Sequence, residues 1–153
     1  MTDEQLRMEL LVGSLAPHGS MAEQEALIER LESLEHSRTA EVTVRVWGRR
    51  VCPEGPTAHT DGGRFVLDRL AAFRAWAADS DRSLEPFFRE EQHRSAFTGE
   101  SYPTVLLPSV ALAEFRGDDL AYLTPHVADG RTVSVADRLD ALERDRPDPL
   151  VAP

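Results

Sequence analysis

A proline followed by two short strand-like segments around a glycine turn constrains the fold of this chain more than any other feature. Pro108 precedes an apolar segment at 110–115, and a second one follows at 120–123. The residues between them, Arg116-Gly117-Asp118-Asp119, are typical of a tight hairpin turn. Because a strand–helix–strand–helix pattern begins at Met8 and leads to this hairpin, the sequence predicts one α/β domain.

The pattern before and after the hairpin sets the expected boundaries. We expect strands at 8–13 and 41–47 and a loop at 125–131. One helix is expected to begin at the capping box Ser20–Glu23, a second to cover about 63–78 with Thr60 or Asp61 as its cap, and a third to begin at Ser134. The domain then covers 8–144, with a flexible segment at 1–7 and a loose tail at 145–153. Residues 83–107 form an irregular insert with extended segments at 84–88 and 102–107, where Pro86 and Pro103 favour edge positions.

Charge and composition indicate a habitat. The formal net charge is −10, every one of the 17 cations is arginine, and Ile28 is the single isoleucine. An acidic chain without lysine fits the salt-rich cytoplasm of a halophile, where charge repulsion is screened. An ordinary acidic protein from a high-GC bacterium is the alternative. One cysteine, Cys52, and no apolar run of about 18 residues favour a reducing cytoplasm and no membrane association.

The element order resembles that of the thioredoxin-like fold. In that family a cis-proline opens the third core strand, a glycine turns the hairpin, and a last helix follows. Pro108, Gly117 and residues 134–144 occupy these places here. The resemblance implies a β-α-β-α-β-β-α domain with an enlarged insert before the third core strand, and a cis bond between Leu107 and Pro108.

The loop that carries the two redox cysteines of thioredoxins differs in this chain. The corresponding residues are Leu15-Ala16-Pro17-His18, so the proline is kept while Leu15 and His18 stand at the cysteine positions. Since thiol–disulfide exchange needs a thiolate and a resolving thiol, we expect a redox-inactive domain. The alternative fold is a ferredoxin-like α+β sandwich, which requires its second helix between the last two strands.

A second resemblance is to small haloarchaeal proteins, some of them labelled helix-turn-helix proteins. It rests on a strand that ends in Val46-Trp47-Gly48 and on Gly99-Glu100 in the insert before the hairpin. This likeness implies an archaeal habitat rather than an activity.

No catalytic or metal-binding constellation stands out. Cys52 lies near Arg49 and Arg50, which favour a thiolate, but it has no partner thiol. The histidines are scattered and show no metal-ligand spacing. We therefore expect no metal and no cofactor. A remaining enzyme hypothesis places His18 in the degenerate pocket, together with Cys52 or carboxylates.

Two surfaces are candidates for partners. Arg45, Arg49 and Arg50 form the one local group of cations, which makes DNA association possible although no two helices are joined by a short turn. The insert and the adjoining strand end carry surplus aromatics: Trp47, Phe87, Phe88, Phe97 and Tyr102. Gathered on the surface, these rings would bind a protein partner or a second copy; alternatively they form a satellite core.

Our leading functional hypothesis is a non-catalytic, redox-inactive protein-interaction or regulatory module. A DNA-associated transcriptional regulator and an enzyme that uses the pocket near His18 are the alternatives.

Overall fold

The computed structural model describes residues 6–13, 21–38, 41–94 and 96–145. The elements follow one another as β1 (Leu6–Val12), α1 (Met21–Arg38), β2 (Glu41–Val46), β3 (Arg50–Val51), the 3-10 helix η1 (Pro56–His59), α2 (Asp61–Asp79), β4 (Arg89–Arg94), β5 (Ser101–Leu106), β6 (Val110–Arg116), β7 (Asp119–Thr124), β8 (His126–Ala128), β9 (Arg131–Val133) and α3 (Val135–Asp145).

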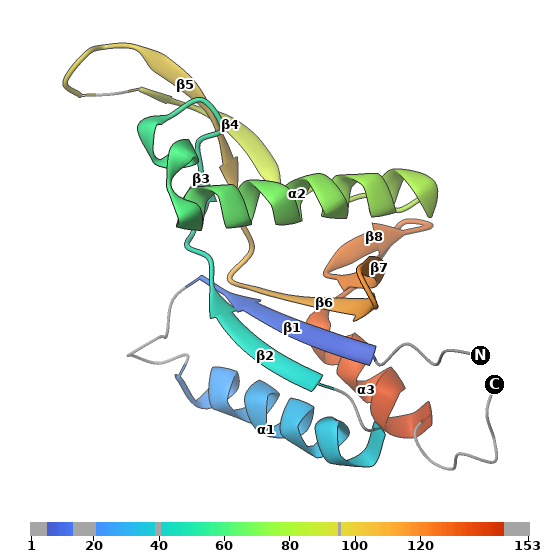
Figure 1. Ribbon diagram of the computed structural model, residues 1–153. Helices are drawn as coiled ribbons and strands as arrows, with labels where there is room; N and C mark the ends of the chain where they lie inside the picture. Colours follow the sequence, from blue (N-terminus) through green and yellow to red (C-terminus); the bar gives the residue numbers. More distant parts are fainter. Residues whose placement is uncertain (1–5, 14–20, 39–40, 95, 146–153) are drawn as a thin grey trace.

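The centre of the molecule is a four-stranded mixed sheet in the order β2-β1-β6-β7. Strand β1 runs parallel to β2 and antiparallel to β6, with Leu6 opposite Arg116 and Val12 opposite Val110. Helices α1 and α3 cover one face of this sheet and α2 covers the other (Figure 1). The predicted α/β class is therefore confirmed.

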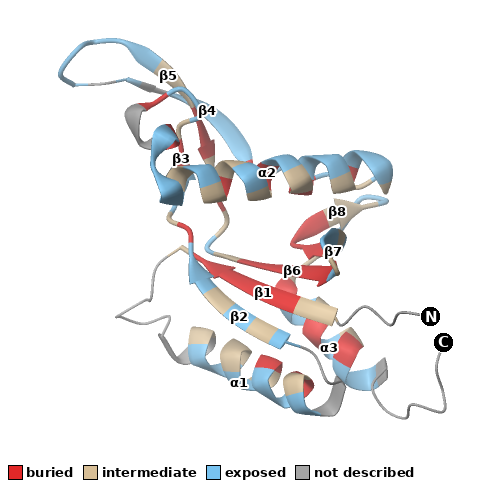
Figure 2. Ribbon diagram, viewed as in Figure 1, coloured by how far each residue is buried: buried red, intermediate tan, exposed pale blue. Residues whose placement is uncertain are grey.

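Strand β1 is buried on both faces because each face meets a different helical layer. Met8 and Leu10 pack into the core formed with α1 and α3, whereas Leu11 packs into the core under α2. The burial is continuous from Met8 to Val12 in β1 and from Ala111 to Phe115 in β6 (Figure 2). A strand enclosed in this way is expected to have a nearly unbroken apolar sequence, as residues 10–12 of β1 do.

The insert forms a second sheet, in the order β3-β5-β4, and its β4–β5 hairpin projects away from the central sheet (Figure 1). The extended segment predicted at 84–88 is wrong, because the strand lies later, at β4. Strand β5 is the middle strand of this sheet, but the edge position predicted for Pro103 is confirmed locally, because one strand alone pairs with β5 at that residue. The proline is accommodated because β3 reaches only Val105 and Leu106, while β4 alone faces Pro103, through Gln92.

Two other predictions need correction. The cis peptide bonds of the described residues precede Pro86 and Pro125, so the cis bond predicted before Pro108 is wrong. The segment around Pro108 connects β5 to β6 and is held by hydrogen bonds from the Leu107 amide to the Arg49 carbonyl (2.8 Å) and from the Gly13 amide to the Ser109 carbonyl (2.9 Å).

The ferredoxin-like alternative is wrong as well, because β6 passes directly into β7 through a turn at Gly117, and α2 precedes both strands. Within the described ranges no helix is both long and apolar enough to cross a membrane.

Candidate functional site

The three arginines singled out from the sequence lie on either side of the turn at Gly48, Arg45 near the end of β2 and Arg49 and Arg50 where β3 begins. Arg45, Arg49 and Arg50 are all exposed. The guanidinium carbon of Arg45 lies 3.9 Å from the centre of the Phe65 ring on α2, so this cation stacks on an aromatic face. Among the described residues, Arg45 and Arg49 form no ion pair with a carboxylate.

This cationic segment is held firmly by its backbone. The Trp47 amide donates to the Val12 carbonyl (2.9 Å), and the Arg49 carbonyl accepts from the Leu107 amide (2.8 Å). Gly48 turns the chain between these two bonds with φ of +87°, a conformation that glycine adopts without strain. Because both ends are fixed, the exposed arginines project from a rigid segment.

The predicted aromatic surface patch does not form. Trp47 and Phe88 are buried and make edge-to-face contacts with Phe73, with ring centres 5.9 and 6.1 Å from that of Phe73. Phe87 and Tyr102 are half-buried. Phe87 packs, with Trp47 and Phe88, in the core between α2 and the central sheet, whereas the Tyr102 hydroxyl donates to the Glu100 carboxylate at 3.3 Å. Phe97 alone of the five is fully exposed, at 99%, in the turn between β4 and β5.

The degenerate redox loop, Leu15, Pro17 and His18, lies outside the described residues, so its prediction stays untested. Cys52 is half-buried, and its Sγ lies 3.3 Å from the Thr104 hydroxyl. In the part of the chain that the structure describes, no group of three or more histidine, cysteine or acidic side chains is placed to hold a metal ion.

Two buried carboxylates that the sequence did not single out bind arginines on the helices. Glu9 of β1 accepts two hydrogen bonds from Arg69 of α2, at 2.6 and 3.0 Å, and is 3% exposed. Glu114 of β6 accepts two from Arg138 of α3, at 2.8 and 2.9 Å, and is 2% exposed. Bidentate, charge-assisted pairs of this kind are strong and directional, so each fixes a helix on its face of the sheet.

The pairing with Glu9 raises the pKa of Arg69 above its ordinary value. Such a pair could have been located from a sequence signal: a glutamate lies inside an apolar strand segment, and an arginine follows on a helix that covers that strand.

A second aromatic cluster surrounds His126. Its ring makes edge-to-face contacts with Trp76 and Tyr122, with both ring centres at 5.4 Å. His126 is fully buried, and its Nδ1 lies 2.6 Å from the Leu123 carbonyl while Nε2 lies 3.4 Å from a nitrogen of Arg82. These partners assign the proton to Nδ1 of a neutral ring. Burial lowers the pKa of His126, and the nearby arginines lower it further.

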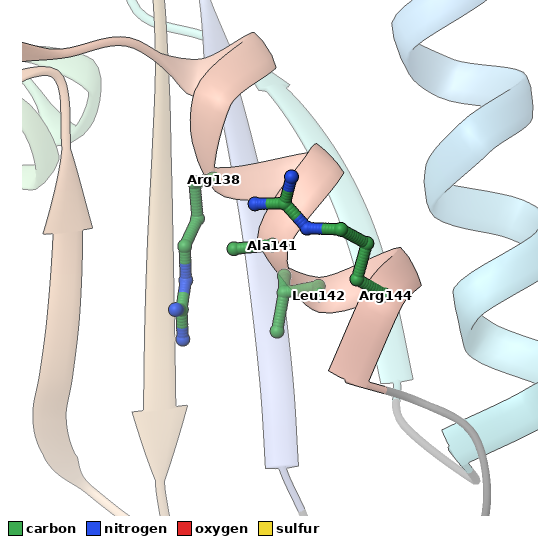
Figure 3. Close-up of a pocket in the computed structure, with 4 residues that line it drawn as sticks. All are labelled: Arg138, Ala141, Leu142 and Arg144. Carbon is green, nitrogen blue, oxygen red and sulfur yellow. The ribbon is translucent and has the colours of Figure 1, made fainter.

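A hollow of about 390 Å³ lies beside α3 and is lined by Arg138, Ala141, Leu142 and Arg144 (Figure 3). Arg138 runs along the neighbouring strand, where it binds Glu114, and the guanidinium of Arg144 turns back along the helix. The charge of Arg138 is therefore neutralised within the chain, by Glu114.

The comparisons with known proteins add one match. A family model described as a helix-turn-helix domain matches residues 1–147. No curated protein and no solved structure matches. Within the described residues, α1, α2 and α3 are separated from one another by strands, and the closest succession of helices is η1 followed by α2, with Thr60 between them.

Proposed function

Because the chain belongs to the helix-turn-helix domain family, we propose that it is a DNA-associated regulatory protein that contacts the phosphate backbone through Arg49 and Arg50, with Arg45 beside them. The observation that carries this proposal is the rigid, exposed arginine segment between β2 and β3, in which Arg45 and Arg49 have no carboxylate partner among the described residues.

The chemistry of the segment fits phosphate. A guanidinium presents a planar fork of donors that matches two phosphate oxygens, and Arg49 and Arg50 are exposed side chains of this kind. The net charge of −10 repels DNA elsewhere on the molecule, so contact through a local segment is favoured over a broad basic face. In the halophile cytoplasm that we propose as its habitat, salt screens this repulsion.

Fluorescence anisotropy with a labelled pool of random-sequence duplex DNA tests the proposal. The double variant Arg49→Glu/Arg50→Glu is compared with Arg74→Glu/Arg131→Glu, which makes the same change of charge at two exposed arginines of α2 and β9. We expect the first variant to lower the affinity and to reduce the slope of log K against log salt by about 2, since each phosphate contact contributes about 0.9.

An equal loss of affinity in both variants would show that only net charge matters. Unchanged binding in the Arg49/Arg50 variant would remove these residues from the contact.

The thioredoxin-like, redox-inactive scaffold is part of the same proposal. It is supported by the strand order β2-β1-β6-β7, by the parallel β1–β2 pair and by the placement of α2 opposite α1 and α3. The protein-interaction module and the enzyme that uses His18 remain predictions.

A further inference from the structure

Strand β2 is an edge of the central sheet, and within the described part of the chain no strand pairs with its outer side. Its six residues, Glu41–Val46, contain no proline and no glycine, and β1 is its neighbour on the inner side. Such an edge exposes backbone donors and acceptors that can pair with another strand. Val46 adds an exposed apolar side chain, at 50%. The opposite edge, β7, is less suitable because a bulge at Glu114/Phe115 interrupts the register beside it.

The direction of the backbone groups along β2 follows from two hydrogen bonds. The Trp47 amide points inward, to the Val12 carbonyl, whereas the Val42 amide points away from β1 and donates to the Glu35 carboxylate at 3.2 Å. Because backbone groups alternate in direction along a strand, Val42 and Val44 direct theirs outward, and Thr43 and Arg45 direct theirs toward β1.

We propose that a second copy of this chain pairs with β2, antiparallel and about a two-fold axis at Thr43. Antiparallel pairing bonds outward-directed residues to outward-directed residues, so Val42 pairs with Val44 of the second copy and Val44 with Val42. Thr43 then faces Thr43 of the second copy as a pair without backbone hydrogen bonds. The Val42 amide exchanges the Glu35 carboxylate for a backbone carbonyl of the second copy.

Charge favours this register over those centred on Glu41 or on Arg45. Glu41 and Arg45 lie on the same face of β2 and are both exposed. With the axis at Thr43, Glu41 faces Arg45 of the second copy at one end and the reverse pair forms at the other. A shift of the axis to Arg45 would place two like charges opposite each other, which is destabilising.

Arg45 can stay stacked on Phe65 while it pairs, because the edge of a guanidinium donates while its face stacks.

Apolar side chains support the same register on the other face. Val42 and Val44 are half-buried against the core formed with α1 and α3. Pairing sets each valine opposite a valine of the second copy, and β-branched cross-strand pairs of this kind stabilise a sheet. The interface is isologous, so it closes as a dimer and leaves neither copy of β2 as an open edge.

Cysteine cross-linking tests the register directly, in a Cys52→Ser background that removes the native thiol. At the axis, Cα atoms of a pair without backbone hydrogen bonds lie about 4.5 Å apart, which suits a disulfide. Thr43→Cys is therefore expected to give a disulfide-linked dimer on mild oxidation. Val46→Cys is the matched control, because in this register its two copies lie about 20 Å apart. Equal linking of both variants, or none by Thr43→Cys, overturns the proposal.

A charge exchange, followed by sedimentation equilibrium at about 0.15 M salt, tests the ion pairs. Glu41→Arg and Arg45→Glu, each alone, are expected to raise the dimer dissociation constant about tenfold or more, and the double exchange is expected to restore it. Glu90→Arg makes the same change of charge as Glu41→Arg, at an exposed residue of β4, and is expected to leave the dimer dissociation constant unchanged. A wild-type chain that stays monomeric, or a double variant as weak as the single ones, refutes the interface. DNA binding enters none of these measurements.

Discussion

Truncation of Arg69 is expected to destabilise the fold far more than removal of the whole Glu9–Arg69 pair. The variant Arg69→Met leaves the Glu9 carboxylate, 3% exposed, under α2 without its two hydrogen bonds. Breaking a buried pair from one side costs about 3–5 kcal/mol. We place the cost near the lower end, about 3 kcal/mol, because the Arg69 side chain is 23% exposed and water reaches part of the site.

The double variant Glu9→Leu/Arg69→Met removes both charges and keeps apolar volume under α2. Such replacements are often nearly neutral, so we expect the double variant to be more stable than Arg69→Met alone. Arg64→Met is the control, since Arg64 is an exposed residue of the same helix and its loss is expected to change stability by less than about 0.5 kcal/mol.

Urea unfolding followed by fluorescence of the two tryptophans, Trp47 and Trp76, measures these differences. With a slope of about 1–3 kcal/mol per molar urea, the Arg69→Met midpoint is expected to fall by about 1–3 M. If the double variant is as unstable as Arg69→Met, the cost comes from lost packing of the long side chain rather than from the uncompensated carboxylate, and the reasoning fails.

Three further predictions concern local features. His126 is neutral in the folded chain because burial lowers its pKa. As the pH falls below about 6.5 the unfolded chain therefore takes up a proton first, and the stability of the fold declines. His126→Gln should flatten the dependence of Tm on pH between about 6.5 and 5, and an unchanged slope would contradict this. Thr60→Ala removes the hydroxyl that accepts from the Gly63 amide at 3.0 Å and should cost about 1 kcal/mol in urea unfolding, whereas no loss would deny Thr60 a capping role. Gly130→Ala forces a side chain into φ of +75° and should lower stability by about 1 kcal/mol; an increase would show that the turn relaxes freely.

Periodic apolar segments predicted the central part of the fold. The strands β1, β2, β6 and β7 and the helices α1, α2 and α3 lie within a few residues of their predicted places. Each of these elements has one or two faces buried in the core, and the spacing of apolar residues along the sequence reflects which face is buried. The cap at Thr60 was also predictable, because a hydroxyl before a helix can accept from its free amides.

The elements that were not predicted are those whose residues show no pattern of alternating burial and exposure. Strand β4, Arg89–Arg94, is polar on both sides because it lies in a projecting hairpin. The hairpin β8–β9 was predicted as a loop, although Asp129-Gly130, both with positive φ, is a strong turn signal between short strands.

The candidate site was predictable only in part, for a related reason. Arg45, Arg49 and Arg50 are exposed, as a group of cations should be. The aromatic residues were misjudged because a tryptophan at a strand end can face solvent or a neighbouring core, and only the position of α2 decides that Trp47 meets Phe73. The carboxylates of Glu9 and Glu114 depend in the same way on helices distant in sequence.

The position of β1 at the centre of the sheet has a consequence for synthesis. Its parallel partner β2 follows after a single helix, but its antiparallel partner β6 begins only at Val110. At about 5–20 residues per second, a ribosome needs about 5–20 seconds to pass from one strand to the other. During that interval the nascent chain contains a β1-α1-β2 unit. In this unit β1, which is apolar on both faces, has no strand paired with the edge that β6 later occupies. Chaperone capture should therefore be strongest on chains that end before β6, and should fall sharply once Arg116 has left the exit tunnel.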